Sequence, residues 1–356
     1  MTAKLPLRSS LLPRHAVRLL LLTAAALGCA ASPLLAQKTD TLVVRNGDVW
    51  TGEIKEYIRG KVEFSTDAAS TIYVKWSRVL SAESDKLWDI DLEDGTKLFG
   101  SLDLGDEHDQ VKIITEGDTL VVATQSVVAL RRIKETFWKR LDGNIDLGFA
   151  FTQQNAKTDL NFGTKVTHKK DFNTFRFDLY TTFSRQNDTD NISRLNTSFT
   201  YLREFAKGWF YGGILKGEQN SQLSLDIRGT AGGAAGRMFI QSNKVYLTGG
   251  LGLSYAREQF VGQPGDNAFQ GVILADFQFF SWGALATDLS TRLIVTPVFT
   301  DWGRWRISSI TSFQREIVAD FYFNVSINEQ FDSRPPTFLE TNKNDLSLTT
   351  SLGWSF

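Results

Sequence analysis

The strongest constraint on the fold comes from residues 344–356, NDLSLTTSLGWSF, in which two kinds of side chain alternate strictly. From position 345 onward, apolar residues and Thr350 occupy one parity, and small or polar residues occupy the other. Such alternation indicates a β-strand with one face in an apolar medium. Outer-membrane barrels commonly end on a strand of this kind and carry aromatic residues at the membrane interface. Trp354 and Phe356 would be such interfacial aromatics here. Because an edge strand of a soluble sheet has a similar pattern, the rest of the chain must decide.

Eleven preceding segments repeat this pattern. In one of them, Phe175 and Phe177 oppose Arg176 and Asp178. Each segment is long enough for a tilted membrane crossing, which takes about 9–11 residues. The sequence therefore predicts an all-β fold whose C-terminal part is a transmembrane barrel of twelve antiparallel strands. The expected strands are 143–153, 158–168, 173–184, 192–204, 208–218, 226–240, 244–257, 268–280, 284–298, 304–314, 317–329 and 344–356.

The connections between these segments show a trend in length. Odd-numbered links such as 258–267 and 330–343 are longer than even-numbered links such as 205–207 and 241–243, although the first and ninth links are short. Outer-membrane barrels have short periplasmic turns and longer external loops. The trend favours a barrel over a soluble sandwich.

Residues 1–36 have the pattern of a secretory signal peptide, with basic residues, an apolar run and then small residues. We expect cleavage after Ala36 or Ala31. The only cysteine, Cys29, lies in a poor lipoprotein acylation motif, so its lipidation stays open. Beyond residue 36 no run of 18 apolar residues occurs, so we expect no transmembrane helix.

Residues 37–135 are expected to form a small β module with an internal duplication, resembling SH3 or Sm-like barrels. Asn46-Gly47 and Asp94-Gly95 are type I′ hairpin signals between alternating strands. Residues 61–64 correspond to 110–113, and residues 77–82 to 125–130. The module carries 19 acidic against 13 basic residues, which argues against nucleic-acid binding. We expect it to pack under the barrel in the periplasm, to contact another envelope component or to hold copies together.

The acidic run from Asp89 to Gly95 begins like a calcium loop, but its glycine is one residue late and Gly100 stands where a bidentate glutamate is needed. We interpret these carboxylates as the solvent-facing side of a strand, and the cluster 103–109 as a solvated turn. We therefore expect no metal and no cofactor. A linker, residues 136–142, contains Trp138 beside basic residues and suits a membrane interface.

Charged residues recur on the polar parity of the predicted barrel. They either line a narrow ion channel or fill the lumen as ion pairs, and we favour pairing because twelve strands leave a narrow lumen. The candidate lumen charges are Asp146, Lys165, Arg176, Asp178, Asp288, Arg292, Arg306 and Asp320. We expect no catalytic residue: His168 falls on the outward parity without an obvious serine partner, although a lipid hydrolase remains an alternative.

The segment 141–356 resembles the domain-of-unknown-function family 481, described as salt-induced outer-membrane proteins. The resemblance rests on residues 141–149 (LDGNIDLGF), the glycine-rich run 229–236, residues 246–252 (YLTGGLG) and the ending from Asp332 to Pro336 and on to Phe356. It implies an outer-membrane barrel and supplies no catalytic residues.

We therefore expect a non-enzymatic outer-membrane barrel, structural or a narrow charged channel. The expected partners are outer-membrane lipid and, through the C-terminal strand, the barrel-assembly machinery. A soluble exported β protein acting as an interaction module is the other alternative, and the ligand and oligomeric state stay open.

Overall fold

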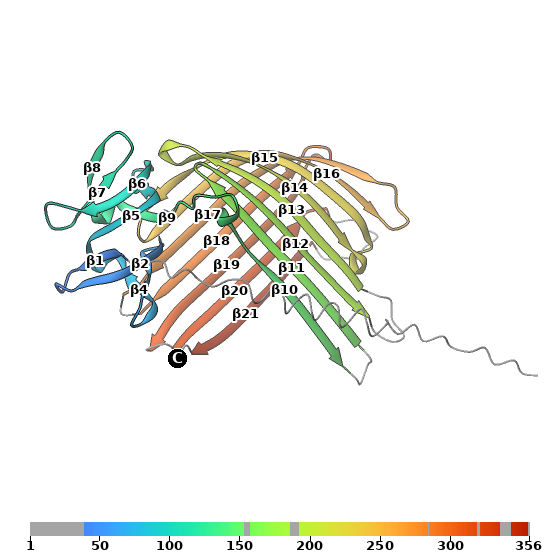
Figure 1. Cartoon of the computed structure of the whole chain (residues 1–356). Helices are drawn as coiled ribbons and strands as arrows, with labels where there is room; N and C mark the ends of the chain where they lie inside the picture. The colour runs from blue at the N-terminus through green and yellow to red at the C-terminus, as the bar shows by residue number, and fades with distance from the viewer. Residues whose placement is uncertain are drawn as a thin grey trace, which may run out of the picture. The chain divides into compact units, whose positions relative to one another are not determined.

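Two antiparallel sheets account for almost all of the described chain (Figure 1). The computed structural model describes residues 39–152, 157–185, 192–283, 285–318, 321–334 and 343–354. The first sheet has nine strands and the second has twelve, and the short helical segments are single 3₁₀ turns. The all-β prediction is confirmed. We call β1–β9 the N-terminal module and β10–β21 the barrel sheet.

The N-terminal module is built from two copies of one unit. In each copy four successive strands are followed by a 3₁₀ turn and a final strand. The 3₁₀ turns η1 (Trp76–Arg78) and η2 (Thr124–Ser126) occupy equivalent places, as the duplication predicted. The strands are β1 (Asp40–Val44), β2 (Val49–Ile58), β3 (Lys61–Thr66), β4 (Ser70–Lys75), β5 (Val79–Leu92), β6 (Lys97–Leu104), β7 (Gln110–Ile114), β8 (Thr119–Ala123) and β9 (Val127–Arg132).

Strand β5 belongs to both copies. Its first half pairs with β1 and its second half pairs with β6 and β9, while β9 also reaches β2. The two copies therefore share one core, in which Tyr57 stacks on Trp76 with ring centroids 4.2 Å apart. The Trp76 indole donates to the Thr124 carbonyl of the other copy at 2.8 Å, which satisfies its polar atom inside the core.

The two predicted hairpins form, but their turns are not type I′. Gly47 and Gly95 have φ of +91° and +83°, whereas Asn46 and Asp94 keep negative φ. Each turn is a three-residue loop in which only the glycine enters the left-handed region, because that geometry strains a side chain that has a Cβ. A two-residue turn with positive φ at both positions lies instead at Arg59 and Gly60, between β2 and β3.

The barrel sheet contains the twelve predicted strands in chain order, each antiparallel to the next. β19 runs on to Val318, so the link expected at residues 315 and 316 lies within the strand. The 3₁₀ turns η3 (Trp138–Arg140), η4 (Ala206–Gly208) and η5 (Ser221–Leu223) precede or join strands. The strands are β10 (Leu141–Thr152), β11 (Lys157–Lys170), β12 (Asn173–Arg185), β13 (Ile192–Glu204), β14 (Trp209–Asn220), β15 (Leu225–Gln241), β16 (Val245–Phe260), β17 (Asp266–Ser281), β18 (Thr287–Val298), β19 (Arg304–Val318), β20 (Phe321–Asp332) and β21 (Asn344–Trp354).

The barrel sheet is strongly curved, and β10 and β21 are its two end strands (Figure 1). We call the space on its concave side the lumen. Within the described residues the ladder ends at these two strands, and residues of both stay exposed along nearly their whole length. In the part of the chain that the structure describes, no helix is long and apolar enough to cross a bilayer.

Candidate functional site

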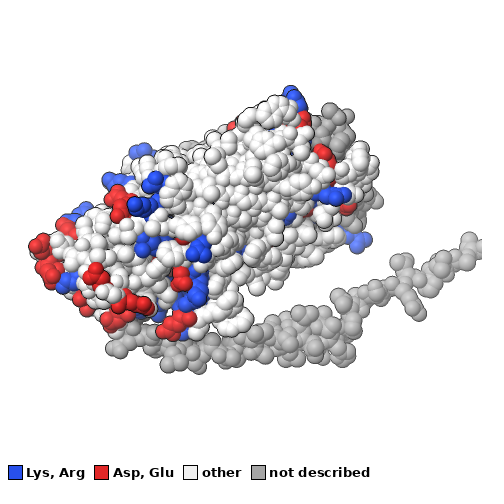
Figure 2. Space-filling view, turned by 90° about the horizontal axis from the view of Figure 1, so that it is seen from above, with Lys and Arg blue, Asp and Glu red and all other residues white. Residues whose placement is uncertain are grey.

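The two faces of the barrel sheet differ in chemistry. On β10, Ile145, Leu147 and Phe149 are 71%, 81% and 70% exposed on the outward face. Figure 2 shows the consequence on the viewed side, where a broad band without charged side chains lies between charged groups at both ends. Large exposed apolar surfaces of this kind mark contact with a membrane or a protein.

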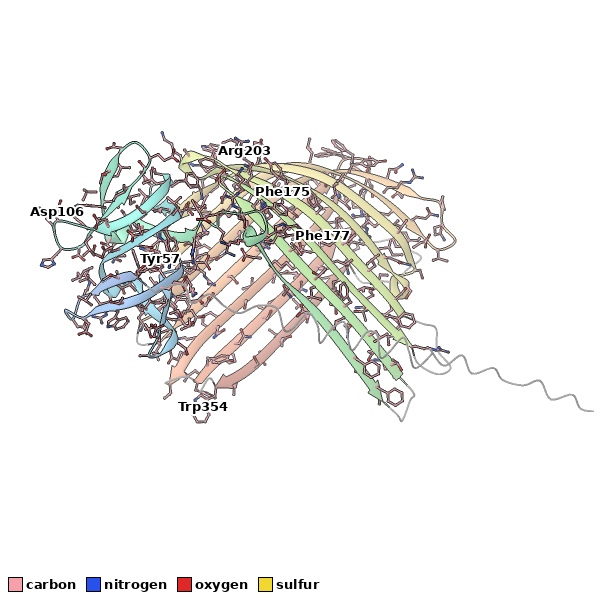
Figure 3. The ribbon with its side chains drawn as sticks, viewed as in Figure 1. Tyr57, Asp106, Phe175, Phe177, Arg203 and Trp354 are labelled. Atoms are coloured by element: carbon pink, nitrogen blue, oxygen red, sulfur yellow. The ribbon has the colours of Figure 1, made fainter. Side chains whose placement is uncertain are left out.

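A chain of rings follows the outward face at the end of the sheet nearest the N-terminal module. His168 lies 4.7 Å from Phe137 and 6.4 Å from Phe175, measured between ring centroids. Phe175 lies 5.0 Å from Tyr201, which lies 6.3 Å from Tyr211. Phe175 and Phe177 are labelled in Figure 3.

Cations lie against aromatic rings of the same rim. The Arg203 guanidinium lies 5.5 Å from the Phe205 ring, and Arg237 lies 5.6 Å from the Trp209 ring. Interfacial anchors of barrels combine rings and cations in this way. Trp138 and Trp354, the predicted interface aromatics, are largely exposed, and Phe356 lies outside the described residues.

The predicted lumen charges take the inward parity wherever they are described. Lys165 is the ladder partner of Asp178, whose carboxylate accepts from the Ser198 hydroxyl at 3.3 Å. Asp146 accepts from Asn144, and Arg176 is the ladder partner of Thr200. Asp320 lies outside the described residues. Asp146, Lys165, Arg176 and Asp178 therefore lie on the inward face of β10–β12. The predicted lumen charges as a whole do not form one cluster.

The remaining candidates are ion-paired. Arg292 pairs with Asp276 at 2.8 Å. At the end of the lumen away from the module, Arg306 pairs with Glu258 at 3.1 Å and with Asp332 at 3.4 Å. These pairs fill the lumen wall rather than leave free charge.

An ionic cluster that the sequence did not reveal lies at the end of the lumen nearest the module. The ammonium of Lys97 lies 3.0 Å from Asp89, 2.7 Å from Asp91 and 3.4 Å from Glu204 of β13. Lys169 of β11 lies 2.9 Å from Asp89 and 3.7 Å from Glu204. Two strands of the barrel sheet are thereby tied to the module.

Asp89 and Asp91 correct the prediction that their strand face is solvated: they are 4% and 7% exposed. Trp88 and Ile90 face the module core. On the opposite parity, Asp91 is paired with Lys97 and Arg131 of the module, and Asp89 is paired with Lys97 and with Lys169 of the barrel sheet. Burial alone would raise the pKa of Asp91, but Arg131, at 2.5 Å, and Lys97 outweigh burial and hold that pKa below its ordinary value. Burial alone would lower the pKa of Lys97, but the carboxylates of Asp91, Glu204 and Asp89 outweigh burial and raise that pKa above its ordinary value.

Hairpin tips supply further contacts between module and sheet. Arg59 pairs with Asp288 at 2.6 Å, and its carbonyl accepts from the Trp282 indole at 2.6 Å. Tyr57 donates to the Asn243 side chain, whose amide donates to the Gln125 carbonyl at 2.8 Å. Figure 3 labels Tyr57, where the module meets the sheet, and Asp106 at the module's far tip.

The second acidic cluster behaves as predicted. Asp106 pairs with Lys112 at 2.6 Å, and its side chain is 78% exposed. Within the described residues no group of three His, Cys, Asp or Glu side chains is arranged to hold a metal ion.

The imidazole of His168 lies against the rings of Phe137 and Phe175, and its Nε2 atom is buried without a hydrogen-bond partner in the described structure. General-base work needs a hydrogen-bonded partner whose proton can be taken. His168 is instead one member of the chain of rings on the outward face of the sheet.

Comparison with known proteins gives one match. No curated protein and no solved structure matches the chain. The model of a family described as "Protein of unknown function, DUF481" matches residues 145–356, which is more than half of the chain and covers nearly all of the barrel sheet. The chain therefore belongs to the DUF481 family.

Proposed function

We propose that this protein is a non-enzymatic β-barrel of the outer membrane, with its N-terminal module in the periplasm. The observation that carries the proposal is the exposed apolar outward face of the barrel sheet, bordered at the module end by rings and cations. Exposing such an apolar face to water is unfavourable in free energy, whereas lipid hydrocarbon can cover the face without breaking any hydrogen bond. The expected partners are outer-membrane lipid and, through the exposed face of β21, the barrel-assembly machinery.

Lipid imposes a second requirement, because an unpaired backbone amide in hydrocarbon costs several kcal/mol. The proposal therefore includes pairing of β10 with β21 in the membrane. Both strands are antiparallel to their neighbours, and in an even-stranded antiparallel sheet the first and last strands have the antiparallel sense needed for closure.

In this proposal the module closes the near end of the lumen, and the resting protein is an envelope structural component rather than an open pore. Lys97, Lys169 and Arg59 each join the module and the barrel sheet through a carboxylate. Removing the module from the mouth means breaking these three ion pairs.

A narrow charged channel is the second candidate. The observation in its favour is the charged inner surface near β10–β12, where Lys165 and Asp178 face each other across a ladder. Planar-bilayer recording separates the two candidates: the plugged barrel gives no discrete conductance steps. Steps that change with Arg176→Gln would favour the channel.

Heat-modifiable gel mobility of the membrane fraction tests the main proposal. A membrane-inserted barrel needs detergent for extraction and migrates faster before boiling than after. Release by salt or carbonate without detergent would favour the soluble interaction module. Lipid release that depends on His168, measured with His168→Ala, would overturn the non-enzymatic assignment.

A further inference from the structure

A cavity of about 560 Å³ lies in the lumen at the end where the N-terminal module contacts the barrel sheet. Asp91, Lys97 and Arg131 of the module form its charged floor, and inward residues of β13–β18 form its wall. A smaller hollow of about 190 Å³ shares wall residues with it, including Phe210 and Ile214, and extends along the lumen. The combined space is within the range of small-molecule sites, which is about 300–1,000 Å³.

The wall of this cavity is mainly apolar, unlike the inner surface near β10–β12. Its apolar side chains include Leu202 of β13, Phe210 and Ile214 of β14, Leu274 of β17 and Ile294 of β18. A glycine at the adjoining hollow cannot carry a side chain, because a Cβ on Gly212 would lie 2.5 Å from the Tyr201 carbonyl oxygen. The inner surface thus stays open at that point.

Charges at the cavity balance. The lining contains three carboxylates, Asp91, Glu204 and Asp276, and three cations, Lys97, Arg131 and Arg292. Each cation is paired with at least one of these carboxylates. A charged ligand would lose its hydration on entering the cavity and would find no unpaired opposite charge there to offset that loss.

Polar donors remain at one side of the cavity. The Arg292 side chain is 60% exposed to the lumen although it is bonded to Asp276. Gln241 and Thr248 also line the cavity. These groups can bind one uncharged polar end of a ligand, while Ile214 and Ile294 contact its hydrocarbon part.

We propose that this cavity binds an uncharged amphiphile, chiefly hydrocarbon with a single hydrogen-bonding end such as a hydroxyl or carbonyl group. The module then forms the floor of a binding site as well as a plug. This inference rests on the barrel architecture of the proposed function and is independent of whether the lumen conducts.

The test uses the full mature protein in lipid nanodiscs and the uncharged fluorescent probe N-phenyl-1-naphthylamine, with empty nanodiscs as background. Saturable probe fluorescence above background is expected, and 1-decanol is expected to displace the probe. Decanoate and decylammonium are expected to need about tenfold higher concentrations, since each brings a charge into a balanced site. Displacement of the probe by decanoate or decylammonium at a concentration as low as that of 1-decanol, or lower, would overturn the proposal.

Two variants locate the site. Ile214→Asn makes the wall polar and Ile214→Trp fills the space, and each is expected to weaken probe binding about tenfold or more. Ile310→Asn is the matched control, because Ile310 lies on inward parity of β19 and outside the cavity lining. Equal loss in the control, or no saturable binding by the wild type, would overturn the proposal. Heat-modifiable mobility is measured on the same samples: a correctly inserted barrel without probe binding refutes this inference alone, whereas failure to insert refutes the proposed function.

Discussion

Arg59 of the N-terminal module donates a hydrogen bond from Nη2 to Oδ2 of Asp288 on β18, at 2.6 Å, across 229 positions of the chain. Asp288 was expected from the sequence to face a lumen, and its partner there is a residue of the module. Arg59 is placed by a turn with positive φ at Arg59 and Gly60, so a local backbone feature of the module determines a contact with the barrel sheet. The chemistry of the lumen therefore depends on both sheets.

The buried junction predicts a large effect of one lysine. Lys97→Met leaves Asp89, Asp91 and Glu204 without their shared cation, and we expect the free energy of unfolding to fall by about 3–5 kcal/mol. Denaturant unfolding of the detergent-solubilised protein measures this. Lys112→Met is the matched control: its partner Asp106 is exposed, and we expect a loss of at most about 1 kcal/mol. Equal losses in the two variants would contradict the cluster's role.

The junction also predicts a pH dependence. The pKa of Asp91 lies below its ordinary 3.8, so its stabilising effect is complete above that value and is lost as pH falls below it. The pKa of Lys97 lies above its ordinary 10.5, so its effect is complete below that value and is lost as pH rises through the folded-state pKa. We expect resistance of the module to proteolysis to decline at both extremes. Asp91→Asn should flatten the acidic decline; an unchanged acid profile would refute the assignment.

A glycine on β15 predicts a packing effect inside the barrel sheet. A Cβ on Gly236 would lie 2.3 Å from the Gly249 carbonyl oxygen and 2.5 Å from the Phe210 ring. We expect Gly236→Val to destabilise the folded state by about 1–3 kcal/mol, because the crowded neighbours include backbone. Gly229, on the same strand, has nothing within 4 Å of a built Cβ, so Gly229→Val should be near neutral. The fraction with heat-modifiable mobility during a urea titration reports both variants.

Closure of the barrel predicts a cross-link between β10 and β21. With Cys29 changed to serine, Leu147→Cys is combined in turn with cysteine at Leu346, Leu348 or Leu352, all on outward parity. Because a disulfide needs Cα atoms within about 7 Å, we expect one combination to form an intramolecular bond efficiently in the membrane. Leu147→Cys with Leu251→Cys on β16 is the negative control. If all three seam combinations form only intermolecular bonds, the seam is open.

The sequence predicts the strands well because alternation is a local property. All twelve strands of the barrel sheet were located from side-chain parity, and the duplication of the module followed from spacing. The pairing of charges was not predictable in this way. Asp89 and Asp91 have the same alternating pattern whether their strand face meets water or Lys169 from a strand far along the chain. The turn conformations at Gly47 and Arg59 likewise depend on how each hairpin is paired, which the dipeptides alone do not specify.

The central claim, that the outward face of the barrel sheet contacts lipid, is tested most directly by spin labels on β16. In a Cys29→Ser background, single cysteines at Leu251 and Leu253 carry labels outward, and those at Thr248 and Ser254 carry them inward. In liposomes, the outward labels are expected to be relaxed strongly by oxygen and weakly by a water-soluble nickel complex, with the opposite order for the inward labels. Equal access of the nickel complex to all four positions would contradict the account.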